Sequence, residues 1–155
     1  MTPALLRQQK LAAQLAATEP KVRAIYVATY IPRECGIATF TKDLTNAINV
    51  LNPHRLADIA ALDDESLGGE HLNYPWEVKY KIDQKSLKSF LDAADYINQS
   101  SAEIVSIQHE FGIFGGKYGE YVVPFIEAIK KPVVLTYHTV LPSPNEQQKD
   151  IIERI

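Results

Sequence analysis

The chain of 155 residues contains a single cysteine, Cys35, and no long block of lysine or arginine. One cysteine can form neither an internal disulfide nor a multi-thiolate zinc site, so we expect a reducing, cytoplasmic setting. The formal net charge of -3 provides no dense basic face of the kind that binds nucleic acid. We therefore expect no nucleic-acid partner.

Long apolar runs are also missing. No stretch approaches the roughly 20 apolar residues that a membrane-spanning helix needs. Arg7 and Lys10 interrupt the N-terminal segment, which therefore lacks the apolar centre of a signal peptide. Residues 1–20 instead predict an amphipathic helix that begins at Thr2 and Pro3. Peripheral attachment to a membrane through this helix stays an open alternative.

From residue 21 onward, segments with strand and helix periodicity alternate. Strands are expected over 23–30, 56–62, 76–82, 104–107 and 133–137, and helices over 36–51, 83–97, 118–129 and from 143 onward. The third strand alternates apolar and charged residues, which is typical of an edge strand. The pattern predicts an α/β fold with a doubly wound parallel sheet of five strands in the order 3-2-1-4-5, in one Rossmann-like domain over residues 21–155.

Two helix starts carry capping signals. Asp83 precedes an apolar helical pattern and is the expected N-cap of that helix. Ser143 to Glu146 reads as a capping box with Pro144 at the first helical position.

A binding crevice in such a sheet opens where the winding direction reverses, here between the first and fourth strands. Residues 31–36 (the first loop) and 108–116 (the second loop) should meet there. Gly36 opens the following helix, whose free N–H groups and dipole favour an anion such as a diphosphate. The competing interpretation is that Gly36 only eases a tight turn.

The second loop is rich in glycine, since four of the seven glycines lie between residues 112 and 119. Gly116 and Lys117 resemble part of a phosphate-binding Walker motif. That motif needs a further glycine where Phe111 stands and a serine or threonine where Tyr118 stands. A nucleoside triphosphatase is therefore excluded.

Two of the four histidines lie beside the expected crevice. His109 follows the fourth strand and can titrate near neutral pH, which favours a ligand contact over a purely structural role. His138 ends the fifth strand, where either role fits equally well. His54 and His71 lie in predicted loops away from the crevice and are expected to be ordinary surface residues.

Three segments resemble family 4 glycosyltransferases, which are retaining enzymes of the GT-B fold. Residues 32–40 (PRECGIATF) resemble the first glycine loop of the family, and residues 108–116 (QHEFGIFGG) resemble its loop after the fourth strand. Residues 132–139 (PVVLTYHT) resemble its fifth strand. The segments occur in the family's order, and the resemblance spans residues 22–155.

The resemblance implies a role for each matching position. His109 would be the catalytic residue that contacts the transferred sugar. Gly36, Ile37 and Arg33 would bind the donor diphosphate. The acceptor side would be formed by Glu110, Gly115, Gly116 and His138.

It also implies transfer of a hexosyl or mannosyl group from a nucleotide-sugar to a glycan or lipid acceptor, with retention by front-face displacement. The leaving phosphate takes the acceptor proton in that scheme, so no protein nucleophile is needed, and the enzyme positions its substrates and stabilises the leaving group. No cofactor and no metal are expected beyond the donor as co-substrate.

The family has a second Rossmann-like domain that supplies most of the nucleotide pocket. We expect this chain, which stops at Ile155, to be the N-terminal, acceptor-side half without that donor domain and to transfer sugar negligibly on its own. The cleft face left exposed is expected to permit self-association.

Three alternatives remain open from the residues alone. Cys35 at a helix start, activated by His109 or His138, would suit a cysteine-dependent hydrolase. His109, Glu110 and His138 could form a zinc site. A non-catalytic interaction domain would use the apolar cleft face to bind a partner.

Overall fold

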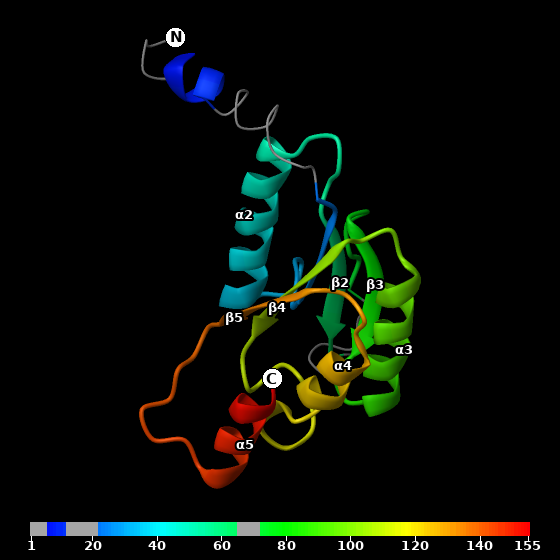
Figure 1. The fold of residues 1–155 in the computed structure, drawn as a ribbon, viewed down its shortest axis with the longest axis vertical. Helices are drawn as coiled ribbons and strands as arrows, with labels where there is room; N and C mark the ends of the chain where they lie inside the picture. The colour runs from blue at the N-terminus through cyan, green and yellow to red at the C-terminus, as the bar shows by residue number, and fades with distance from the viewer. Residues whose placement is uncertain (1–5, 12–21, 65–71) are drawn as a thin grey trace.

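Five parallel strands form one sheet in the order β3-β2-β1-β4-β5 in the computed structural model, which describes residues 6–11, 22–64 and 72–155 (Figure 1). The strands are β1 (Ala24–Ala28), β2 (Asp58–Asp63), β3 (Val78–Asp83), β4 (Ile104–His109) and β5 (Val133–Tyr137). The helices are α2 (Gly36–Leu51), α3 (Leu87–Gln99), α4 (Val122–Ala128) and α5 (Glu146–Arg154), with a short 3₁₀ helix η2 (Lys117–Gly119). The predicted Rossmann-like fold class and strand order are confirmed.

Helices cover both faces of the sheet, α2 on one and α3 and α4 on the other (Figure 1). Under α2, Tyr26 and Ile59 pack with Leu44. On the other face, Phe90 and Phe125 belong to the larger cluster. A fully buried side chain such as that of Phe90 or Phe125 stabilises the fold by on the order of 1.5–3 kcal/mol relative to an exposed one.

Strand composition explains strand position. β1 and β2 are almost entirely buried, as expected of central parallel strands with apolar interiors, although β2 begins and ends with an aspartate. β3 lies at one edge of the sheet and alternates exposed lysines with partly or fully buried apolar side chains such as Tyr80 and Ile82. The predicted edge strand is confirmed, although it begins at Val78 and leaves Trp76 in the preceding turn.

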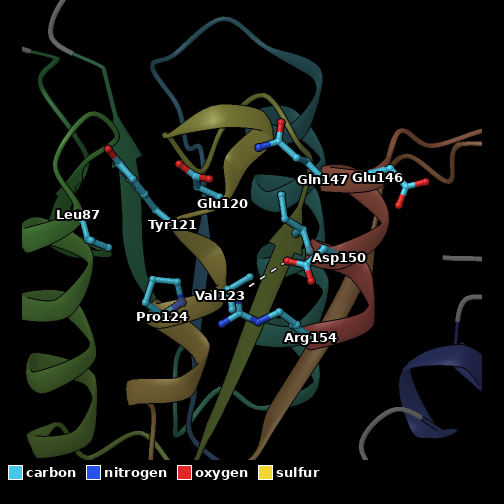
Figure 2. A pocket seen from close by; sticks show the side chains of 10 residues that line it. Leu87, Glu120, Tyr121, Val123, Pro124, Glu146, Gln147, Asp150 and Arg154 are labelled. Carbon is cyan, nitrogen blue, oxygen red and sulfur yellow. Dashed lines mark ion pairs between the residues drawn. The ribbon is translucent and has the colours of Figure 1, made fainter.

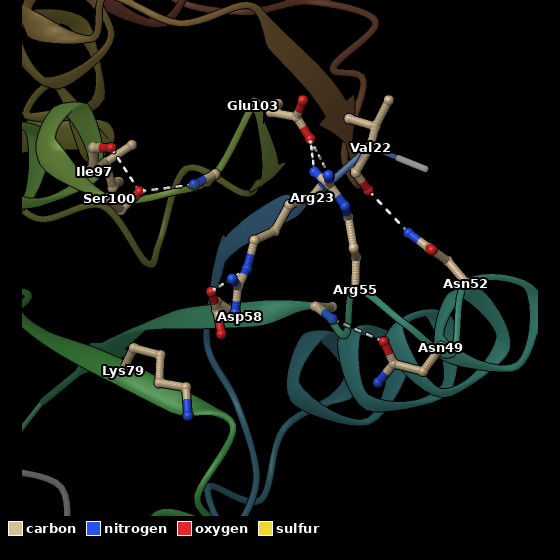
Figure 3. A network of polar contacts seen from close by, with 12 residues as sticks. Val22, Arg23, Asn49, Asn52, Arg55, Asp58, Lys79, Ile97, Ser100 and Glu103 are labelled. Carbon is tan, nitrogen blue, oxygen red and sulfur yellow. Dashed lines mark hydrogen bonds and ion pairs between the residues drawn. The ribbon is translucent and has the colours of Figure 1, made fainter. Parts of the chain in front are cut away.

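Ion pairs close the amino end of the sheet (Figure 3). Arg23 pairs with Asp58 at 3.2 Å, and Arg55 pairs with Glu103 at 2.7 Å. The Glu103 carboxylate also accepts a hydrogen bond from the backbone N–H of Arg23 at 2.9 Å. Such exposed pairs contribute about 0–1 kcal/mol each, and they hold the starts of β1, β2 and β4 in register.

Two helix caps differ from the sequence prediction. The N-cap of α3 is Ser86, whose side chain accepts from Ser89 N, while the Asp83 carboxylate accepts from Lys85 N at 2.9 Å in the turn before it. The capping box of α5 joins Asn145 and Gln148. Ser143 has Glu146 three residues later and Asn145 has Gln148, so both fit the sequence pattern of a capping box, and the helix begins after the second of them.

The helix predicted over 118–129 begins later. Tyr118 and Gly119 have positive φ angles of 57° and 81°, so the chain makes the short turn η2 before α4 starts at Val122. A Cβ at Gly119 would lie 2.5 Å from the backbone oxygen of Phe111. That close approach fixes the left-handed turn and shortens the helix.

Part of the predicted N-terminal helix is present, because residues 6–11 are helical. Thr2, Pro3 and residues 65–71, which include His71, lie outside the described residues. In the described parts of the chain, no helix is both long enough and apolar enough to cross a bilayer.

Candidate functional site

The first and second loops leave the same edge of the sheet. β1 and β4 are parallel neighbours, with Val27 opposite Ile107, so both strands end at this carboxyl edge. The second loop starts later than predicted, because Gln108 and His109 are still part of β4. This edge is the reversal point of the sheet, where ligands of doubly wound folds bind.

Gln84 connects the two loops. Arg33 Nη1 donates to Gln84 Oε1 at 3.0 Å, and Gln84 Nε2 donates to the backbone oxygen of Gly112 at 3.0 Å. The backbone N–H of Gln84 donates to Asp63 O at 2.8 Å. Gln84 is not among the site residues predicted from the sequence. Its position directly after β3, at the carboxyl edge of the sheet, is the signal that could have identified it.

The glycines of the second loop fit closely around this connector. Gly115 and Gly116 have φ angles of 68° and 67°. A Cβ at Gly115 would lie 1.8 Å from the backbone oxygen of Gln84. The loop borders a cavity of about 490 Å³, here called the glycine-lined cavity. Its walls are formed by Gln84, Lys85, Phe111, Gly112, Gly115, Gly116 and Tyr118.

The start of α2 faces open space. Cys35 is the N-cap, and its Sγ accepts from Ala38 N at 3.4 Å and lies 3.1 Å from Thr29 Oγ1. Within the described residues, the N–H groups of Gly36 and Ile37 donate no hydrogen bond. A Cβ at Gly36 would meet nothing within 4 Å. The helix start is therefore accessible to an anion.

His109 is fully buried among aromatic rings. Its imidazole stacks on Phe114 with centroids 5.7 Å apart, and Phe111 and Tyr137 approach it edge-on at 5.1 and 5.4 Å. Neither ring nitrogen has a hydrogen-bond partner within the described residues. Unpaired buried polar atoms are rare and costly, so the His109 nitrogens are candidates for hydrogen bonds to a ligand.

Burial lowers the pKa of His109 below its ordinary value, with the His138 charge adding to the effect and the Glu110 carboxylate opposing it. The ring is therefore neutral near pH 7. A neutral imidazole carries one donor nitrogen and one acceptor nitrogen. It can hydrogen-bond a hydroxyl group in either sense.

His138 lies on the other face of the sheet from His109. Its Nε2 is 3.0 Å from Gln108 Oε1, and Phe40 of α2 contacts its ring edge-on at 4.8 Å. His109 instead stacks on Phe114, which belongs to the cluster under α3 and α4. The structure therefore does not bring the two imidazole rings together on one wall.

Glu110 links the second loop to the segment after β5. Its carboxylate accepts a short hydrogen bond from Thr139 Oγ1 and another, at 3.0 Å, from Phe111 N. The backbone N–H of His138 donates to His109 O at 3.0 Å. Glu110 thus holds the loop in place through contacts within the chain.

The residues expected for a cysteine-dependent hydrolase or a zinc site are not arranged for either chemistry in the described part of the chain. No hydrogen bond joins Cys35 to a histidine in the described part of the chain. Among residues 6–11, 22–64 and 72–155, no three or more His, Cys, Asp or Glu side chains are grouped to hold a metal ion.

A groove of about 470 Å³ lies between α3, α4 and α5 (Figure 2). Figure 2 shows Asp150 and Arg154 paired along α5, and Arg154 also pairs with Glu127 at 3.0 Å. None of the residues predicted for the site lines this groove.

Comparisons of this chain with protein-family models, curated proteins and solved structures find no match. Function is therefore inferred from the geometry of the described residues and from the three segments singled out in the sequence.

Proposed function

We propose that this chain forms the acceptor-side half of a retaining glycosyltransferase that uses a nucleotide-sugar donor. The observation that carries the proposal is the Gln84 connection. It joins the loop of Arg33 to the loop of Gly112 at the reversal point of the sheet. A donor diphosphate at one loop and the reacting sugar at the other would then lie across a single crevice.

The start of α2 supplies the groups for the donor diphosphate. The N–H groups of Gly36 and Ile37 donate no hydrogen bond within the described residues, and the helix dipole favours negative charge there. Of the nitrogens of the Arg33 guanidinium, only Nη1 donates hydrogen bonds within the described residues. A guanidinium has five N–H donors, so the rest of this group is free to contact phosphate oxygens.

In the proposed reaction, the bond between the sugar and the donor phosphate breaks while the acceptor oxygen bonds to the same face of the sugar. The leaving phosphate oxygen takes the acceptor proton. The residues of this chain position the substrates and stabilise the charge that develops on the leaving diphosphate.

His109 would hydrogen-bond a hydroxyl of the transferred sugar. Its neutral state suits that role, since it retains one donor and one acceptor nitrogen. Because its ring is fully buried, Phe111 or Tyr137 must move aside before a sugar can reach it. Pairing with the sugar would then satisfy a polar group that has no partner among the described residues.

Titration of the ¹⁵N-labelled chain with UDP, GDP and ADP tests the proposal by NMR. We expect at least one of these diphosphates to shift the amide signals of Gly36 and Ile37, and to shift Gly112 through the Gln84 connection. Inorganic phosphate at the same concentration is the control for a simple anion effect. Shifts confined to lysine-rich surface segments, or none at Gly36, would contradict the proposal.

A further inference from the structure

A second cavity, of about 350 Å³, lies between α5 and the segment that follows β5. Its volume falls within the range of small-molecule sites. None of the residues assigned above to the donor, the sugar or the acceptor lines it. Six apolar side chains form most of its wall: Phe111, Tyr137, Val140, Leu141, Pro144 and Ile152. We call it the apolar cavity.

Three polar residues in the wall of the apolar cavity, Thr139, Lys149 and Glu153, have partners within the chain. Thr139 Oγ1 donates to the Glu110 carboxylate. Lys149 Nζ lies 3.7 Å from Glu153 Oε1 on the next turn of α5. Because the Lys149 and Glu153 side chains are largely exposed to solvent, the wall that a buried ligand would meet is mainly apolar, and a charged group placed against it would lose hydration. Its chemistry selects an uncharged apolar group.

The apolar cavity adjoins the buried histidine. Phe111 and Tyr137 line it, and the same two rings contact His109 at 5.1 and 5.4 Å. Phe111 also lines the glycine-lined cavity. The Phe111 ring therefore lines both cavities and also contacts the His109 imidazole.

We infer that the apolar cavity binds the uncharged aliphatic or aryl tail of an amphiphilic acceptor. The hydroxyl-bearing head of that acceptor lies on the other side of Phe111, toward the glycine-lined cavity. The identification of this ligand as an acceptor rests on the proposed transferase function. Binding of the tail itself requires neither donor nor transfer. The wall chemistry favours this occupant over a charged metabolite.

Two glucosides with the same head group test this inference by NMR. Octyl β-D-glucoside, kept below its micelle-forming concentration, carries an apolar tail, and methyl β-D-glucoside does not. We expect the octyl compound to shift the amide signals of Val140, Leu141 and Ile152. The methyl compound at the same concentration should leave those signals in place.

Two exposed valines provide a matched pair of variants. Val140 is 84% exposed and lines the apolar cavity, whereas Val50 is 74% exposed and lies on α2. Both positions tolerate a polar side chain without loss of the core. Val140→Asp should weaken octyl glucoside binding at least about tenfold, because it places a charge at the cavity wall. Val50→Asp should bind as the unmodified chain does.

A third variant, Leu141→Trp, reduces the volume of the cavity and should weaken binding similarly. The inference is overturned if both glucosides shift the same signals, if Val140→Asp binds normally, or if shifts scatter over Val50 and Val134. It is also overturned if the signals of Leu141 and Ile152 depend on protein concentration without ligand, since a second copy of the chain then fills the cavity.

The outcome is separable from that of the proposed function. Octyl glucoside binding without any diphosphate binding at Gly36 would support the tail-binding site and contradict the proposed transferase function. Diphosphate binding without octyl glucoside binding would support the proposed transferase function and overturn the tail-binding site.

Discussion

Arg33 and Gln84, 51 residues apart in the chain, are joined by a hydrogen bond of 3.0 Å from the guanidinium to the side-chain oxygen. The amide nitrogen of the same Gln84 side chain donates to Gly112. One nearly buried glutamine thus fixes the distance between the two loops on which the proposed function depends.

Replacing Gln84 by leucine should release both loops. The substitution leaves the Gly112 carbonyl and part of the Arg33 guanidinium without partners, and we expect a loss of about 1–3 kcal/mol in the free energy of unfolding. Urea unfolding measures the loss, and the amide signal of Gly112 reports on the loop. Gln99→Leu, at the exposed end of α3, is the control. Equal stability of the two variants would show that the Gln84 hydrogen bonds do not stabilise the folded chain.

Gly36 allows the N–H contribution to diphosphate binding to be isolated. Gly36→Pro removes one N–H at the first position of α2, where proline is compatible with a helix, and the extended Cys35 suits a following proline. We expect diphosphate affinity to fall about tenfold or more, which is the effect of losing one hydrogen bond to a charged group.

Gly36→Ala retains the N–H, and its Cβ meets nothing within 4 Å. It should bind diphosphate nearly as well as the unmodified chain. Calorimetric titration of both variants distinguishes the roles, and similar affinities for proline and alanine would argue against the N–H contacts.

His109 should make stability depend on pH. Its pKa in the folded chain lies below the ordinary 6.5 because of burial. As the pH falls below about 6.5, the unfolded chain binds a proton that the folded chain does not, so stability decreases by at most ~1.4 kcal/mol per pH unit. Above that pH, this contribution is constant.

His109→Phe should lose this pH dependence and be at least as stable at acidic pH, because two unpaired nitrogens leave the core. His109→Leu offers a smaller side chain should the phenyl ring not fit. Urea unfolding between about pH 5 and pH 8 gives the difference from the unmodified chain. A slope that persists in both variants would assign the effect to other groups.

Two glycines of the second loop should respond differently to alanine. Gly115→Ala places a Cβ 1.8 Å from Gln84 O at a positive φ, and we expect a loss of at least about 1–3 kcal/mol in stability. Gly112→Ala meets nothing within 4 Å and should cost far less. Thermal unfolding of the pair measures the contrast, which would vanish if the loop relaxed freely around the new methyl group.

Much of the fold could be predicted from periodicity. α2 and β5 have the bounds expected from their apolar patterns. The alternating, half-exposed pattern of the third strand identifies it as an edge strand and so supports the predicted strand order. The start of α4 could not be predicted, because the left-handed turn at Tyr118 and Gly119 depends on the close approach of Phe111 O. The sequence predicts Ser143 as the cap of α5, whereas Asn145 caps it, because two residues with N-cap propensity lie two positions apart.

The candidate site was predictable in location but not in detail. The reversal point and the loop glycines identified the edge. The bridging role of Gln84 depends on neighbours far away in the sequence, which no local pattern reveals. The enclosure of His109 by three rings and the separation of His138 onto the other face follow from packing and strand alternation in three dimensions.

A crystal structure of the chain with a bound nucleoside diphosphate would test the central claim most directly. The account predicts phosphate oxygens about 2.7–3.2 Å from the backbone nitrogens of Gly36 and Ile37, with Arg33 beside them. A diphosphate bound anywhere else on the chain, with the start of α2 left empty at saturating ligand, would contradict it.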